Sequence, residues 1–251
     1  MLRVLILGGT GDAAKLVERV ANITGIQVIS SLAGRTREPV APVGNVRVGG
    51  FGGAAGLAEY LRTENINVLI DATHPFAAQI SENAAEVAEM LGIPRLILSR
   101  PGWERQEGDD WLEVENHTEA AKVLENRGKR VFLTIGRQEI GAFAHLRKIW
   151  FLMRMIDPPT DDYIPNGEIL CDRGPFTLEN EKAILRQYEI DTIVSKNSGG
   201  AATYPKIIAA RELGIPVIMV KRQPIPDGEV VADIDSAVKW LLEKVDGNTL
   251  F

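Results

Sequence analysis

The chain has 251 residues, of which 45% are hydrophobic and 25% charged, and its net charge is −6. This composition is typical of a globular protein with a sizeable core, and the negative charge argues against general nucleic-acid binding. The single cysteine excludes an intramolecular disulfide, and the three histidines lie too far apart for a local metal motif. No apolar run is long enough to span a bilayer. We therefore expect a cytoplasmic protein with no metal, membrane or nucleic-acid partner.

The N-terminal segment combines three features in a fixed order. Residues 2–7 read LRVLIL, a glycine-rich turn follows, and a helix-like pattern begins at residue 13. A buried strand, a glycine turn and a helix start predict a phosphate-binding βα unit, in which the helix N-terminus binds a pyrophosphate. The spacing Gly8-x-x-Gly11-x-x-Ala14 departs from G-x-G-x-x-G, and a tight turn without a ligand is the alternative. The candidate cofactor contacts are Gly8, Gly9, Thr10, Gly11 and Asp12.

The second expected strand, residues 26–31, ends without a carboxylate. An NAD-type fold usually has an acidic residue there, on the ribose hydroxyls. The residues here are Ser31, Gly34 and Arg35 instead. A guanidinium binds phosphate in a forked geometry, so this strand end favours the 2′-phosphate of NADPH over NADH. The alternative is an exposed loop whose arginines are only solvated.

Strands and helices alternate along the rest of the chain, which indicates parallel sheets covered on both faces. A polar segment at 100–110, RPGWERQEGDD, interrupts the alternation and is the best candidate for a domain boundary. The predicted fold is α/β, with two Rossmann-like parallel-sheet halves, residues 1–105 for dinucleotide binding and 106–251 for the substrate. The boundary is placed to within about 12 residues. After it, the expected strands are 111–114, 130–134, 149–155, 169–171, 190–194 and 216–220, with a final helix at 233–245.

The two halves share one pattern. Each has a strand, a polar loop, a helix, the turn L-G-I-P and a further strand, with the turn at 91–94 and at 213–216. L-G-I-P is also a common helix-to-strand turn, which is the alternative to an internal repeat. Open α/β sheets bind ligands at the carboxyl ends of their strands, so two such halves predict a cleft between them.

Polar residues follow three of the expected strands. They are Asp71, Thr73 and His74 after 66–70, Arg137 after 130–134, and Lys196, Asn197, Ser198 and Gly199 after 190–194. His74 could transfer a proton or be structural, and Asp71 could cap a helix or hold Thr73. Lys196 before Asn-Ser-Gly-Gly suits an anion, and its alternative is a surface lysine beside a turn.

Five segments resemble the precorrin-6A reductases of the cobalamin pathway, a family that includes cobalt-precorrin-6A reductases. They are LILGGTGDA at 5–13, SLAGR at 31–35, DATHPFA at 71–77, KNSGG at 196–200 and AARELGIPVIMVKR at 209–222. The resemblance covers nearly the whole chain. It implies a two-part Rossmann-like enzyme that reduces one double bond of the precorrin-6A macrocycle with a reduced nicotinamide cofactor, giving precorrin-6B.

The same resemblance implies a tetrapyrrole substrate with many carboxylates. Candidate contacts are Arg137, Lys196, Asn197, Ser198 and Gly199, with Arg154, Arg173 and Arg222 as further cations. Lys196, His74 and Asp71 are the candidate catalytic groups, and Thr73 is a candidate cofactor contact. NADPH is favoured by the second strand end, while anaerobic-branch relatives are associated with NADH, so NADH stays open.

Two other functions stay open at this stage. One is a different NAD(P)-dependent reductase or epimerase on the same scaffold, and the other is a dinucleotide sensor without turnover. Short-chain dehydrogenases are disfavoured, because Tyr204 and Lys206 do not have Y-x-x-x-K spacing. The sequence does not specify the oligomeric state or whether cobalt is already in the ring.

Overall fold

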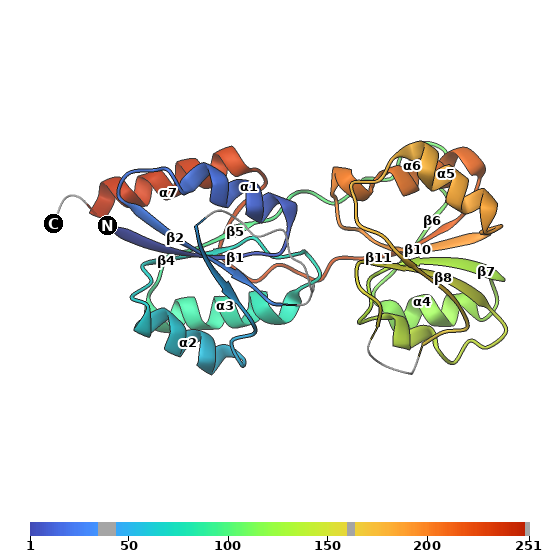
Figure 1. Cartoon of the computed structure of the whole chain (residues 1–251), viewed down its shortest axis with the longest axis horizontal. Coiled ribbons are helices and arrows are strands. Elements are labelled where there is room, and N and C mark those ends of the chain that lie inside the picture. The colour runs from blue at the N-terminus through green and yellow to red at the C-terminus, as the bar shows by residue number, and fades with distance from the viewer. Residues whose placement is uncertain (35–43, 160–163, 249–251) are drawn as a thin grey trace. The chain divides into compact units, whose positions relative to one another are not determined.

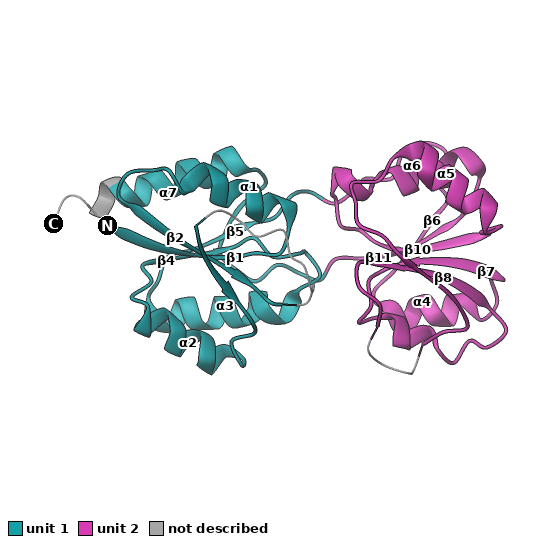
Figure 2. Cartoon of the chain, in the orientation of Figure 1, with its two compact units in different colours: residues 1–101, 223–251 teal, residues 102–222 magenta. Residues whose placement is uncertain are grey.

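The computed structural model describes residues 1–34, 44–159 and 164–248, which form two compact units. Unit 1 comprises residues 1–101 and 223–251, and unit 2 comprises residues 102–222 (Figure 2). Each unit has a six-stranded sheet in which neighbouring strands run parallel. Helices cover both faces of each sheet, and the predicted α/β fold with two parallel-sheet halves is confirmed.

The sheet of unit 1 has its N-terminal strand near the centre. In spatial order the strands are β12 (Glu229–Val231), β5 (Arg95–Leu98), β4 (Val68–Asp71), β1 (Leu2–Leu7), β2 (Ile26–Leu32) and β3 (Asn45–Val48). Helices α1 (Gly11–Val20) and α7 (Ile234–Asn248) cover one face, and α2 (Ala54–Thr63) and α3 (Ala78–Leu91) cover the other (Figure 1).

The apolar run of β1 is buried on both faces, as central parallel strands require. Val4 and Ile6 pack in the core beneath α1 and α7, whereas Leu5 and Leu7 pack in the core beneath α2 and α3. This alternation follows from the two-residue period of a strand. The carboxyl end of β1 is thereby fixed between two helical layers, and the glycine turn follows directly.

The C-terminal residues depart from the expected domain division. The predicted second domain ran from 106 to 251, but β12 pairs with β5 in unit 1, with Glu229 opposite Leu96. Helix α7 joins the core of unit 1 through Ala237 and Leu241. The reason is a three-residue edge strand, EVV, which is too short and too exposed to give a periodic signal. The chain therefore leaves unit 1 after Pro101, near the expected boundary, and returns at Gln223.

The sheet of unit 2 follows the same plan. In spatial order its strands are β6 (Trp111–Val114), β11 (Val217–Val220), β10 (Thr192–Lys196), β7 (Arg130–Thr134), β8 (Trp150–Met155) and β9 (Gly167–Cys171). Helices α5 (Leu178–Gln187) and α6 (Pro205–Leu213) cover one face, and α4 (His117–Leu124) covers the other (Figure 1). Short 3-10 turns, η1 (Ile140–Phe143) and η2 (Ala201–Thr203), follow β7 and β10.

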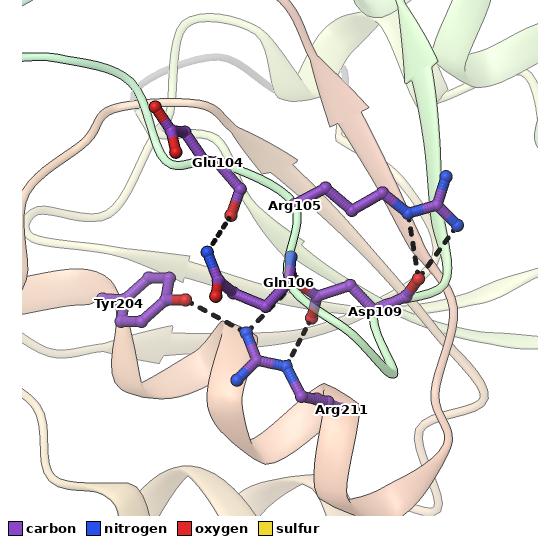
Figure 3. Close-up of polar contacts among 6 residues, drawn as sticks. All are labelled: Glu104, Arg105, Gln106, Asp109, Tyr204 and Arg211. Atoms are coloured by element: carbon purple, nitrogen blue, oxygen red, sulfur yellow. Dashed lines mark hydrogen bonds and ion pairs between the residues drawn. The ribbon is translucent and has the colours of Figure 1, made fainter.

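Residues 102–110, here called the connecting loop, are folded onto α6 (Figure 3). The Asp109 carboxylate is buried and accepts hydrogen bonds from Arg211 Nε at 2.8 Å and from the Gln106 N–H at 2.8 Å. Arg105 donates to the Asp109 carbonyl, and Arg211 also donates to the Tyr204 hydroxyl at 3.0 Å. Residues 102–110 of the polar segment that marks the boundary are therefore folded as part of unit 2.

Candidate functional site

The glycine turn after β1 has the geometry of a ligand-binding helix start. Thr10 caps α1: its Oγ1 accepts from the Ala13 N–H at 3.1 Å and donates to the Ala72 carbonyl at 2.8 Å, which ties the ends of β1 and β4 together. Apart from the adjoining backbone and the two chain neighbours, a Cβ added at Gly9 or Gly11 would have no atom of the described residues within 4 Å. The first N–H groups of α1 lack intrahelical acceptors, so this open space lies beside groups that can donate hydrogen bonds to an anion.

A cation lies at the end of β2, but it comes from the neighbouring strand. Arg47 of β3 is opposite Ser31 in the parallel register, and its Nη1 is 3.4 Å from Ser31 Oγ. The guanidinium lies 3.8 Å above the Phe51 ring and donates to the carbonyls of Gly49 and Gly50. Arg35 lies outside the described residues.

Asp12, a predicted cofactor contact, forms an ion pair with Arg100 just after β5. Both side chains are partly exposed, at 33% and 24%. The pairing puts a guanidinium beside the first turn of α1. Arg100 thus adds a second cation to the carboxyl edge of this sheet, along with Arg47.

The loop after β4 is held by its own side chains. Asp71 is buried, and its Oδ1 accepts from the Thr73 N–H at 3.1 Å and from the Thr73 hydroxyl at 2.7 Å. Its second oxygen, Oδ2, is buried and has no hydrogen-bond partner among the described residues. His74 Nδ1 accepts from the Phe76 N–H at 3.3 Å. Asp71 therefore holds Thr73, which is one of the two structural alternatives given for it, and its catalytic role stays a prediction.

In unit 2, Lys196 forms an ion pair with Glu139, a residue that the sequence analysis did not select. Lys196 ends β10, and its Nζ is 3.5 Å from Glu139 Oε1. Gly136, at φ +89°, makes the turn after β7 that carries Arg137 and brings Glu139 back toward the lysine. A Cβ at Gly136 would make ordinary contacts with Glu139 Oε2 at 3.6 Å and Lys196 Nζ at 3.9 Å, so glycine is favoured here by its positive φ and not by lack of space.

His117 is the third member of this cluster. It is the first residue of α4, and its Nε2 is buried with no hydrogen-bond partner among the described residues. Burial lowers the pKa of His117 below its ordinary value; Glu139 opposes that shift and Lys196 adds to it. A neutral imidazole, a carboxylate and an ammonium therefore gather at the carboxyl edge of the second sheet.

Asn197 forms hydrogen bonds with residues near both ends of unit 2, Trp103 and Arg222. Its Oδ1 accepts from the Trp103 N–H at 2.7 Å, and its Nδ2 donates to the Trp103 carbonyl at 3.0 Å. Arg222 Nε donates to the Asn197 carbonyl at 2.7 Å. The next residue, Ser198, has its hydroxyl 3.4 Å from that of Thr203. The amide predicted to bind substrate is thus engaged with the connecting loop.

The sequence matches the family described as "Precorrin-6x reductase CbiJ/CobK" over residues 3–242. The chain belongs to this family. The Precorrin-6A reductase of Rhodococcus erythropolis is 50% identical over 242 residues, which are 96% of this chain and 98% of that protein. The Precorrin-6A reductase of Sinorhizobium sp is 47% identical over 244 residues, 95% and 94% of the two chains. A solved structure described as CobK precorrin-6A reductase has 40% identity and a TM-score of 0.90, and covers 97% of each chain.

Membership of the precorrin-6A reductase family confirms the resemblance given by the five segments. The chain is accordingly an oxidoreductase of cobalamin biosynthesis that reduces a ring double bond. The family implies a nicotinamide cofactor and a tetrapyrrole substrate. In the part of the chain that the structure describes, none of the helices is long and apolar enough to cross a bilayer. The described His, Cys, Asp and Glu side chains also include no group of three placed to hold a metal ion.

One cation that the sequence offered to the reductase's substrate is not available. Arg154 is only 6% exposed, forms a two-bonded ion pair with Glu181, and lies 3.7 Å over the Phe176 ring. It is part of the core of unit 2, and that expectation is wrong. Arg173 follows β9 on an exposed segment, and Arg222 is bound to Asn197.

Sequence reasoning missed four residues near the expected ligand contacts of the reductase. They are Arg47 and Arg100 in unit 1, and His117 and Glu139 in unit 2. Arg100 and Glu139 lie within a few residues of strand ends, which is a usable signal. Arg47 lies inside a short exposed strand, and His117 starts a helix, so neither position stands out without the sheet register.

Proposed function

We propose that this reductase uses NADPH to reduce a ring double bond of metal-free precorrin-6A to precorrin-6B. The relatives from Rhodococcus erythropolis and Sinorhizobium sp, at 50% and 47% identity, are named Precorrin-6A reductase, with no cobalt in the name. We propose the same compound as the substrate of this chain. The observation that carries the proposal is the open space over Gly9 and Gly11 at the start of α1. A diphosphate there would meet helix N–H groups and the positive end of the helix dipole. The bound nicotinamide would supply hydride to the ring.

The preference for NADPH rests on the end of β2. Ser31 is buried there with no neighbouring carboxylate in the strand, and the Arg47 guanidinium lies 3.4 Å from its hydroxyl. A 2′-phosphate needs such cationic donors, whereas the ribose of NADH is usually held by an acidic residue. We assign the 2′-phosphate to Arg47 together with Arg35, which directly follows Gly34, a glycine with a φ of +71°.

The substrate's carboxylates are assigned to the carboxyl edge of unit 2. Lys196 carries the ammonium, and Ser198, Gly199 and Arg137 belong to the same two strand-end loops. Glu139 balances the Lys196 charge before substrate binds, at 3.5 Å. A substrate carboxylate would take its place on the ammonium. A cation near the ring also stabilises the electron density that arrives with hydride.

Reduction of the double bond needs a proton as well as hydride. We assign the donor to His74, which would give up a proton as an imidazolium. Its Nδ1 accepts from the Phe76 N–H in the neutral ring, so this contact would open when Nδ1 is protonated. Asp71 is assigned to orienting the Thr73–His74 turn, because its Oδ1 is bound twice by Thr73. Lys196 then acts as the electrostatic group and His74 as the acid.

The direct test is anaerobic incubation with precorrin-6A and with its cobalt form, each with NADPH and with NADH. We expect nicotinamide oxidation with precorrin-6A and NADPH, and the absence of oxidation in all four mixtures would overturn the proposal. K196A should bind NADPH normally and lose tetrapyrrole reduction. K221A is the matched control, because Lys221 pairs with Glu115 at the end of the neighbouring strand. Equal turnover in K196A and K221A would remove Lys196 from the mechanism.

The cofactor assignment has its own test. R35A and R47A should each weaken NADPH much more than NADH, measured as dissociation constants by nicotinamide fluorescence. R62A is the control, because Arg62 is an exposed arginine in the last turn of α2. Equal losses for the two dinucleotides would contradict the 2′-phosphate argument.

A further inference from the structure

Lys206 is a buried lysine that the proposed chemistry does not use. It is the second residue of α6 and only 3% exposed, beside the apolar residues Ile207, Ala209 and Ala210. Lysine is almost never fully buried unless it is paired. Its Nζ donates to the Thr203 carbonyl at 2.9 Å and lies 4.6 Å from the centre of the Trp103 ring. A main-chain acceptor and an aromatic face are thus its close contacts.

The charges around Lys206 do not compensate it. Glu181, on α5, is already bound by both terminal nitrogens of Arg154 on β8. The pKa of Lys206 is lowered to about 7, chiefly by burial and then by Arg154 and Lys196, with Glu181 opposing the shift. Holding an ammonium here costs stability that an apolar side chain would not cost. A lysine at this position therefore calls for a role other than packing.

The two contacts of Lys206 lead to the two ends of one segment, residues 197–203, here called the site loop. Thr203 is its last residue, and the Thr203 hydroxyl lies 3.4 Å from that of Ser198. Trp103 is bonded through both backbone groups to Asn197, the first residue of the segment. Lys206 thus touches one end directly and the other through Trp103.

We propose that Lys206 is a positioning residue that holds the site loop, through Thr203 and Trp103, in the conformation that presents Lys196 and Ser198 to the substrate. This inference rests on the proposed substrate site in unit 2. It assigns Lys206 no contact with substrate or cofactor. Its charge strengthens both contacts, because a charged donor binds a carbonyl more strongly and only an ammonium is attracted to the ring face.

The arrangement makes the loop sensitive to pH. The charged groups that face Lys206 are Arg154 on β8, Glu181 on α5 and Lys196 on β10. As pH rises through the neutral range, Lys206 loses its proton and the attraction to the Trp103 ring is lost. The amine still donates to Thr203, but more weakly. The site loop should therefore become looser, and the KM for the tetrapyrrole should rise.

The test compares K206M and K206R with wild type in the full chain. Amide hydrogen exchange of residues 197–203 is measured without ligands at pH 6, and KM and kcat are measured with NADPH and precorrin-6A. We expect K206M to exchange about tenfold faster in the site loop and to raise the KM for the tetrapyrrole about tenfold. The KM for NADPH should stay unchanged. K182M is the matched control, because Lys182 is a partly buried lysine that pairs with Glu212 away from the site loop.

K206R keeps its charge at every pH, so the ratio of its KM at pH 8.5 to its KM at pH 6 should be near one. The same ratio for the wild type should be greater than one. Wild-type exchange of residues 197–203 in K206M would overturn the inference. If K206M does not fold, equal pH dependence of wild type and K206R would overturn it instead. A wild-type enzyme that does not reduce the tetrapyrrole would defeat the proposed function, whereas faster exchange in K206M would still support the positioning role.

Discussion

The side-chain amide of Asn197 is bonded to both backbone groups of Trp103, at 2.7 Å to its nitrogen and 3.0 Å to its carbonyl oxygen. This two-bond bridge replaces the pairing that the Trp103 peptide groups would otherwise find in a strand or in water. Gly102 is part of the same contact, because a Cβ there would lie 3.2 Å from the Asn197 amide. The bridge joins the end of β10 to the connecting loop, so the two should respond together to substitution.

Removing the bridge should destabilise the chain. N197A leaves the Trp103 N–H and carbonyl without their partner, and we expect a loss of about 2 kcal/mol in the free energy of unfolding. N197D can accept from the N–H but cannot donate to the carbonyl, so it should also be destabilised. The measurement is urea denaturation followed by tryptophan fluorescence. N83A is the control, since Asn83 makes an exposed contact with Gln79 on α3 and should change stability by less than about 0.5 kcal/mol. A wild-type midpoint for N197A would contradict the structural role.

The parts of the fold that the sequence predicts are those with local signals. The run LRVLIL, the glycine turn and the start of the helix pattern are contiguous, so the first βα unit follows from propensity and period alone; the Thr10 cap is added by the structure. The assignment of 223–251 to unit 1 does not follow, because it depends on pairing between Glu229 and Leu96, far apart in the chain. A strand of three residues is too short to show a hydrophobic period, and its distant partner strand leaves no local signal in the sequence.

The candidate site divides in the same way. The candidates Lys196 and Asp71 can be selected from their positions at strand ends, where parallel sheets bind ligands, and their roles stay predictions. Arg47 is missed because its place beside Ser31 depends on the register of β2 and β3. Lys206 is missed because its contact with Trp103 requires the connecting loop to fold back on α6. Contacts of this kind join residues that are far apart in the sequence, so the spacing of nearby residues does not predict them.

Thr10 caps α1, and it is also proposed to contact the cofactor; a matched pair of variants separates the observed role from the proposed one. T10A removes the cap of α1 and the bond to the Ala72 carbonyl, so it should cost about 1 kcal/mol of stability and also weaken NADPH binding. T177A removes the equivalent cap of α5, where Thr177 Oγ1 accepts from the Asn180 N–H at 3.3 Å. It should cost similar stability and leave NADPH binding unchanged. Dissociation constants and thermal denaturation of both variants provide the comparison. Equal NADPH affinity in the two would argue against a ligand at α1.

Gly11 offers a test of the open space itself. A Cβ there would have no described atom within 4 Å, and the residue is the first of α1, so G11A should keep or slightly raise stability. The same methyl group would occupy the place proposed for the diphosphate, so the NADPH dissociation constant should rise at least about tenfold, or 1.4 kcal/mol. G56A is the opposite case, because a Cβ at Gly56 would lie 1.8 Å from the Phe51 carbonyl oxygen and should unfold α2. Unaltered NADPH affinity in a stable G11A protein would exclude the diphosphate from this position.

His117 can report on the charges at the carboxyl edge of unit 2. Burial chiefly lowers its pKa, Glu139 raises it and Lys196 lowers it. K196A should therefore raise the pKa of His117, and E139Q should lower it.

The measurement is the pH titration of the imidazole carbon resonance, which is simple because the chain has three histidines. K221M should leave the His117 titration unchanged, since Lys221 pairs with Glu115 and is absent from the groups that shift His117. The folded pKa lies below the unfolded value of about 6.5, so the unfolded state binds more protons between these two values. The contribution of His117 to stability should accordingly increase as pH rises through that window, and more steeply in E139Q than in K196A. The reverse order of the two shifts would mean that Lys196 and Glu139 do not both face this imidazole.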